Sequence, residues 1–118
     1  MLTFLQQGII TLVRFDRNVD MLHANYIQDV LMSLVERPAP HVVLDLRAMH
    51  VVDSAGVATF LMAVRRASRN EGRLAFVVGD SHALRIFQLT GVDRIFEIFS
   101  TVEGAFAALL DGAPPLPI

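Results

Sequence analysis

The residues best placed for chemistry are Asp53 and Ser54, which follow an apolar run with an aspartate, Asp45, near its end. The run, Val42–Leu46, is rich in β-branched residues and predicts a buried strand. Asp53 and Ser54 then open an amphipathic stretch reaching Asn70, so we expect a helix to begin there with a capping residue. A hydroxyl at this point lies beside unpaired backbone N–H groups and the positive end of the helix dipole. The sequence therefore predicts one place that would accommodate an added phosphate.

The predicted helix has two distinct faces. At 100° per residue, the positions that cluster against the sheet are Val57, Phe60, Leu61, Val64 and Ala67. A separate ridge toward solvent consists of Ser54, Ala58, Met62, Arg65 and Arg69. A methionine beside arginines suits an adaptable contact with a partner, whereas the alternative is a solvated face with one stray apolar residue. Ser54 has two interpretations as well, because serine and aspartate are both common helix caps.

The elements that must position this helix alternate between strands and helices. Two short strands, Leu2–Gln6 and Ile9–Phe15, are separated by Gln7-Gly8 and predict a hairpin. The other elements expected are a helix over Met21–Glu36, strands over His41–Leu46 and Leu74–Val78, a helix over His82–Thr90 capped by Asp80 or Ser81, a strand over Ile95–Phe99 and a helix ending at Leu110. Gly72 is expected at the C′ position after the second helix, and Gly91 in a Schellman-type ending.

The predicted order, β-β-α-β-α-β-α-β-α, indicates an α/β fold. After the N-terminal hairpin, alternation of strands and helices implies a mixed, mostly parallel central sheet with right-handed crossovers. The strands at His41–Leu46 and Leu74–Val78 have no polar face, so we expect both to be central and covered on both sides. A chain of 118 residues has room for one core, which we expect within residues 1–111, followed by a proline-rich flexible tail at 112–118.

Composition limits the kinds of partner. The chain is 53% hydrophobic with a mean hydropathy of +0.50, which is high for a small free-standing domain. We therefore expect leftover apolar surface that a partner or a second copy covers, so a homodimer is one possibility. A net charge of −2 and a pI near 6.0 argue against nucleic acid as the main ligand.

Several function classes find no support in the residues. The chain has no cysteine, which excludes disulfides and thiolate chemistry and fits a reducing cytoplasm. We expect no leader peptide, and every apolar stretch is interrupted before the roughly 18 residues that a membrane span needs. The histidines are scattered without ligand spacing, so no metal site is predicted; they are His23, His41, His50 and His82. Nucleotide-binding glycine motifs are absent, and the residues before Ser54 do not form a hydrolase elbow. We expect neither a cofactor nor enzymatic activity.

The sequence resembles the STAS domain of the anti-sigma factor antagonist family from about Leu2 to Leu110. The segments that carry this resemblance are Val42–Leu46, Val52–Val57, Gly72-Arg73-Leu74, Leu89–Val92 and Ile95-Phe96. The Asp-Ser-x-Gly segment at residues 53–56 is the most specific of them.

The resemblance implies a protein-interaction switch in transcription regulation. In such antagonists, the serine after the aspartate is phosphorylated by a partner that is both an anti-sigma factor and a serine kinase. The unphosphorylated form binds that kinase, the phosphorylated form is released, and a phosphatase resets it. Carried onto this chain, the phosphoacceptor is Ser54, and Ala55 stands where relatives often have a second hydroxyl. Asp53 and the ridge would then contact the partner.

Two other functions remain open at this stage. The chain could be a non-switching STAS scaffold subunit of a transporter or of a stress-signalling complex, with Ser54 serving only as a cap. A small nucleotide- or ligand-binding module is a weaker possibility, which no motif in the chain supports.

Overall fold

The computed structural model describes residues 2–16, 24–49 and 52–111. The expected tail at 112–118, the first residues of the helix expected from Met21, and two of the histidines, His23 and His50, lie outside these residues.

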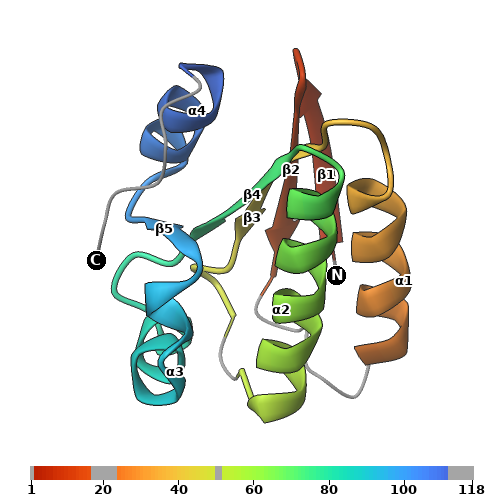
Figure 1. Cartoon of the computed structure of the whole chain (residues 1–118). Helices are drawn as coiled ribbons and strands as arrows, with labels where there is room; N and C mark the ends of the chain where they lie inside the picture. The colour runs from red at the N-terminus through yellow and green to blue at the C-terminus, as the bar shows by residue number, and fades with distance from the viewer. Residues whose placement is uncertain (1, 17–23, 50–51, 112–118) are drawn as a thin grey trace.

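A five-stranded sheet forms the centre of the molecule (Figure 1). Its strands, in spatial as well as chain order, are β1 (Leu2–Gln7), β2 (Ile10–Phe15), β3 (His41–Asp45), β4 (Arg73–Val77) and β5 (Glu97–Phe99). β1 pairs antiparallel with β2, and all the other neighbours are parallel. This arrangement confirms the expected α/β fold.

Helices cover both faces of the sheet. The helical elements are α1 (Ala24–Val35), α2 (Ser54–Arg69), α3 (His82–Thr90), a short 3-10 helix η2 (Val92–Arg94) and α4 (Val102–Leu110). α1 and α2 run side by side over one face (Figure 1), and α3 packs on the same face through the buried Ala83 and Phe87. Among the described elements, α4 alone covers the opposite face, through Ala105 and Leu109.

The larger core is organised around aromatic rings. Phe60 of α2 makes edge-to-face contacts with Phe15, Phe76 and Phe87, with ring centroids 5.4–6.3 Å apart. Phe76 also stacks on Phe96 at 4.5 Å. Such pairs stabilise a core by about 0.5–1.5 kcal/mol each beyond their buried area. They fix α2, and with it the residues at its first turn, against the sheet.

The hairpin turn lies one residue later than expected. Gln7 is the last residue of β1, and the turn consists of Gly8 and Ile9. Gly8 has a φ of +60°, as the first central position of a II′ turn requires. The last strand is also shorter than expected, because the N–H groups of Ile95 and Phe96 donate to the Val92 carbonyl at 2.9 and 2.8 Å and leave only Glu97–Phe99 to pair with β4.

Glu71, and not Gly72, has the left-handed conformation that ends α2. Its φ is +62°, and the N–H groups of Glu71 and Gly72 donate to the carbonyls of Ser68 and Ala67 at 3.1 and 2.8 Å in a Schellman arrangement. The expectation that glycine occupies C′ was therefore wrong. Gly72 is instead required by proximity, because a Cβ at this position would overlap the Pro40 carbonyl oxygen.

The other helix ends follow their sequence signals. Gly91 has a φ of +82° and its N–H donates to the Gln88 carbonyl at 3.3 Å, so a left-handed glycine ends α3 as expected. Ser81 lies at the N-cap of α3, but its side chain makes no cap hydrogen bond. The hydroxyl of Thr101 accepts a hydrogen bond from the N–H of Gly104 at 3.0 Å and so caps α4.

Candidate functional site

Asp53 caps helix α2, and Ser54 is its first helical residue. Asp53 has an extended backbone, and its Oδ1 accepts a hydrogen bond from the N–H of Gly56 at 3.0 Å. Its carbonyl accepts the first intrahelical bond, from the N–H of Val57, also at 3.0 Å. Because Asp53 satisfies the cap, the Ser54 hydroxyl is not needed for it.

The side chain of Ser54 is exposed to solvent. Among the described residues, its hydroxyl has no hydrogen-bond partner. It therefore lies in water at the positive end of the 16-residue helix, next to backbone N–H groups that α2 leaves unpaired. An oxygen in this position is accessible to a phosphate donor, and an attached phosphate would extend away from the core.

The predicted ridge is exposed along the whole length of α2. All five of its members, Ser54, Ala58, Met62, Arg65 and Arg69, are in the exposed class. Met62 is 43% exposed, a large fraction for an apolar side chain on a helix that packs on a core. The opposite face is buried, with Val57, Phe60 and Ala67 in the core. Leu61 and Val64, which were also predicted on the inner face, are half-buried and pack against the edge of the core. Contact of the ridge with a partner stays a prediction.

The arginines of α2 differ in their pairing. Arg66 donates to Glu36 beyond the end of α1 at 3.1 Å. Within the described part of the chain, Arg65 and Arg69 make no ion pair, so both cations on the ridge face solvent uncompensated. The ridge therefore has a hydroxyl at one end, a methionine near the middle and positive charge at the other end.

A charged cluster that was not predicted as a site lies at the carboxyl ends of β2 and β3. Asp45, whose side chain is only 4% exposed, accepts hydrogen bonds from Arg47 Nε and Nη2 at 2.9 Å and from Arg14 Nε at 3.2 Å. The backbone N–H of Arg47 also donates to Asp45, at 3.1 Å. Burial alone raises the pKa of Asp45, but the hydrogen bonds and charges of Arg47, with the charge of Arg14, outweigh it and hold the pKa below its ordinary value.

This cluster lines a shallow hollow, and its Arg14–Asp45 hydrogen bond links the carboxyl ends of β2 and β3. Arg14, Asp45, Arg47 and Ala48 form its walls. The sequence contained one signal for it, the aspartate that ends an otherwise apolar strand. Its partner Arg14 is 31 residues away in the chain and could not be identified from spacing.

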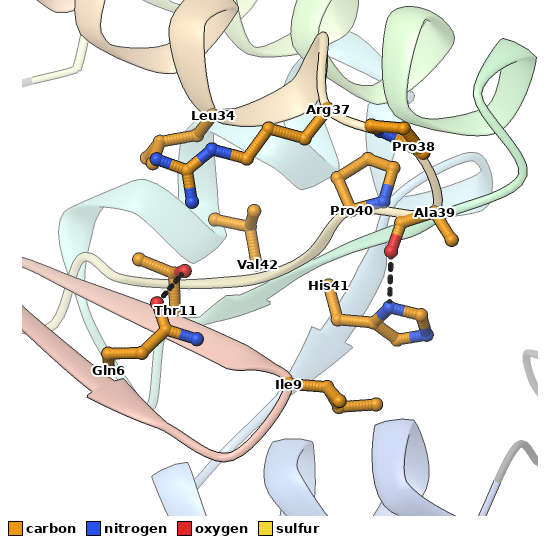
Figure 2. A pocket seen from close by; sticks show the side chains of 10 residues that line it. All are labelled: Gln6, Ile9, Thr11, Leu34, Arg37, Pro38, Ala39, Pro40, His41 and Val42. Carbon is orange, nitrogen blue, oxygen red and sulfur yellow. Dashed lines mark hydrogen bonds between the residues drawn. The ribbon is translucent and has the colours of Figure 1, made fainter.

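A second hollow, of about 100 Å³, lies at the opposite end of the sheet (Figure 2). Its polar groups largely satisfy one another, because Thr11 donates to Gln6 Oε1 at 2.6 Å and His41 Nδ1 donates to the Ala39 carbonyl at 2.8 Å. Figure 2 shows both bonds, with the Arg37 side chain extended over the hollow. The length of α2 separates this hollow from Ser54, and we assign the hollow no ligand.

The described residues form neither a metal-binding cluster nor a membrane-spanning helix. No group of three or more histidine, aspartate or glutamate side chains is arranged to hold a metal ion in residues 2–16, 24–49 and 52–111. Over the same residues, no helix has the length and apolar character needed to cross a membrane.

Comparison with known proteins gives consistent results. Residues 3–105 match the STAS domain family. BtrV of Bordetella bronchiseptica, provisionally described as an anti-sigma factor antagonist, is 26% identical over 96 residues, which cover 81% of this chain and 83% of BtrV.

Two solved structures show the same fold. An anti-sigma factor antagonist from Mycobacterium paratuberculosis superposes with a TM-score of 0.81 at 22% identity, covering 94% of each chain. The Bacillus cell fate determinant SpoIIAA in its phosphorylated form gives a TM-score of 0.68 at 15% identity, covering 91% of this chain and 97% of SpoIIAA.

Proposed function

Because the chain belongs to the STAS domain family, we propose that it is an anti-sigma factor antagonist controlled by phosphorylation of Ser54. In this proposal, the unphosphorylated protein binds an anti-sigma factor that is also a serine kinase and so frees a sigma factor. Phosphorylation releases the kinase, and a phosphatase restores the binding form. The protein itself is not an enzyme, requires no cofactor and acts in the cytoplasm.

The observation that carries this proposal is the exposed Ser54 hydroxyl on a helix that Asp53 already caps. A serine that served as the cap would lose that hydrogen bond when modified, and the helix would lose about 1 kcal/mol. Here the cap bond belongs to Asp53, so a phosphate on Ser54 would leave it in place. The description of one similar structure, SpoIIAA, as phosphorylated supports the idea that this fold tolerates the modification.

The charge added to Ser54 explains how such a switch would work. A phosphate brings about −1.5 to −2 charges to the helix N-terminus. The helix dipole favours that charge, whereas the Asp53 carboxylate next to it opposes it, so the net effect on folding is expected to be small. A partner surface shaped for a neutral hydroxyl would instead have to bury a dianion. Losing a few kcal/mol of binding free energy lowers affinity about a hundredfold or more.

The ridge on α2 supplies the rest of the proposed contact surface. Met62 is an exposed apolar side chain that can adapt to a partner. Arg65 and Arg69 make no ion pair with the described residues, so they can pair with carboxylates on that partner. We therefore expect the kinase to cover α2 from Ser54 along the ridge, with an acidic patch opposite the two arginines.

The experiment is phosphorylation of the purified chain by a serine kinase that binds it. Incubation with ATP followed by peptide mass spectrometry should place the phosphate on Ser54, and Ser54→Ala should abolish it. Ser68→Ala is the matched control, because Ser68 is an exposed serine on the same helix. Phosphate on another residue, or none with a kinase that demonstrably binds, would contradict the proposal.

A second candidate function rests on the apolar side chains that stay exposed in and next to β1. Phe4, Leu5 and Ile9 are each about half exposed or more. Such a surface is also expected of a non-switching scaffold subunit with a permanent interface. If the affinity of this chain for its partner protein is unchanged by Ser54→Ala and by Ser54→Glu, the scaffold function is favoured.

A further inference from the structure

The outer edge of β1 is unprotected. β1 is the first strand of the sheet, so one of its sides has no neighbouring strand in the described structure. Its sequence, Leu-Thr-Phe-Leu-Gln-Gln, contains no charge, proline or glycine, and its register with β2 runs without a bulge from Leu2 to Gln7. Natural proteins usually protect such edges with a charge, a proline or a bulge, because an open edge pairs with other strands.

Both faces of the sheet expose apolar side chains at this edge. Phe4 is 48% exposed on the face covered by α1 and α2, since it is paired with the core residue Val13. Leu5 is 54% exposed on the face covered by α4, since it is paired with Leu12. An added strand would therefore bury apolar surface above and below the sheet as well as backbone groups.

From these features we infer that a second copy of this chain pairs with β1, antiparallel and about a two-fold axis at Phe4. The hairpin geometry sets this register. Gln7 and Ile10 flank the two-residue turn, and backbone groups alternate from there between facing β2 and facing outward. The residues that direct their N–H and C=O groups outward are then Leu2, Phe4 and Gln6, and this set is symmetric about Phe4.

Two-fold pairing satisfies every one of those outward groups. Phe4 lies opposite the partner's Phe4, and Leu2 lies opposite the partner's Gln6. Thr3 and Leu5 of the two copies become neighbours on the other face. Such an interface is self-complementary and closed, which is the commonest arrangement in homo-oligomers.

Charge is compatible with a second copy as the occupant. The strand carries no charge, and the nearest charged residue on its neighbour is Arg14, paired with Thr3. Two copies of Arg14 would lie three strand spacings apart, about 14 Å or more. This distance exceeds the Debye length of about 8 Å at physiological salt, so like charges would not oppose the pair. The opposite edge of the sheet, β5, has only three residues, which disfavours open-ended growth from β1 to β5.

The first test is analytical ultracentrifugation of the whole chain across a wide concentration range. The wild type should form a dimer, and Phe4→Lys should raise its dissociation constant about tenfold or more, since an edge lysine blocks pairing. Leu89→Lys is the matched control, because Leu89 on α3 is 82% exposed and distant in the fold from β1. A monomer at every concentration, a dimer unaffected by Phe4→Lys, or open-ended assemblies would each overturn the inference. Circular dichroism checks that the variants are folded.

The second test uses the absence of cysteine from the chain. In the proposed register, the two Phe4 Cα atoms are about 5.5 Å apart, within disulfide range. Phe4→Cys should therefore form a covalent dimer on mild oxidation. Gln7→Cys should not, because the two copies of residue 7 would lie about 20 Å apart along the strands. Equal cross-linking of the two variants would contradict the register. Neither test depends on whether Ser54 is phosphorylated.

Discussion

Asp53 Oδ1 accepts a hydrogen bond from the N–H of Gly56 at 3.0 Å, so the helix cap and the candidate phosphoacceptor are adjacent but separate residues. Had one side chain done both tasks, modification would have competed with folding. The separation makes the two roles individually testable.

The first prediction concerns the stability of α2. Asp53→Ala should lower the free energy of unfolding by about 1 kcal/mol, because it removes the cap hydrogen bond. Ser54→Ala should change it by no more than about 0.5 kcal/mol, since the exposed hydroxyl has no partner in the described structure. Urea denaturation of the two variants measures both values. A larger loss for Ser54→Ala than for Asp53→Ala would mean that the cap has been misassigned.

A second prediction concerns the junction that ends α2. Gly72→Ala should destabilise the protein by about 2 kcal/mol or more, because the added Cβ overlaps the Pro40 carbonyl and the segment must shift. Glu71→Gly should stabilise it by up to about 1 kcal/mol, because glycine adopts a positive φ without strain. Thermal unfolding of the two single variants should therefore show shifts of opposite sign.

A third prediction follows from the lowered pKa of Asp45. A carboxyl whose pKa is lower in the folded than in the unfolded state stabilises the fold above the unfolded pKa. That stabilisation is lost as the pH falls through the folded value. Asp45→Asn should cost about 2 kcal/mol near neutral pH, since it breaks the buried contacts with two partly exposed arginines. The difference between wild type and variant should shrink below about pH 4.

Unfolding curves at several pH values between neutral and acid check this. Glu103→Gln is the control, because Glu103 is exposed and acts on Arg47 through its charge alone, without a hydrogen bond. Its effect should be small at every pH. A wild-type–variant difference for Asp45→Asn that stayed constant down to the lowest pH would argue against an ionised Asp45 in the native state.

The fourth prediction tests the ridge and depends on the proposed function. Met62→Ala should weaken binding to the anti-sigma kinase by about tenfold, because a partly exposed apolar contact would be lost. Arg69→Glu should weaken binding more at low salt than at high salt, because the proposed partner surface opposite Arg69 is acidic. Titration calorimetry at two salt concentrations measures both effects. Leu89→Ala, an equally small change at an exposed apolar residue on α3, should leave affinity unchanged.

The sequence predicted those features that depend on local periodicity. The bounds of α2 and α3 differ from expectation by at most one residue, because their apolar spacing and end signals lie within the helices themselves. Exposure of the ridge followed from the same helical geometry. The two strands without a polar face, β3 and β4, are buried on both sides as expected.

Features that depend on distant residues could not be predicted. A glycine was expected at position 72 for its backbone conformation, but the constraint on Gly72 comes from Pro40, more than thirty residues earlier. The Asp45 cluster needs Arg14 from another strand. The sequence also predicted surplus apolar surface without locating it. Only the strand order shows that β1 is an edge and that Phe4 and Leu5 lie there.

The length of α2 has a consequence for signalling. Sixteen residues extend about 24 Å, from Ser54 to the end where the Asn70 side chain binds the Val35 carbonyl. Ionic screening makes a new charge at the first turn nearly undetectable at the last. Any protein that distinguishes the two covalent forms must therefore touch that first turn itself. A regulator bound only near Arg69 would respond identically to both.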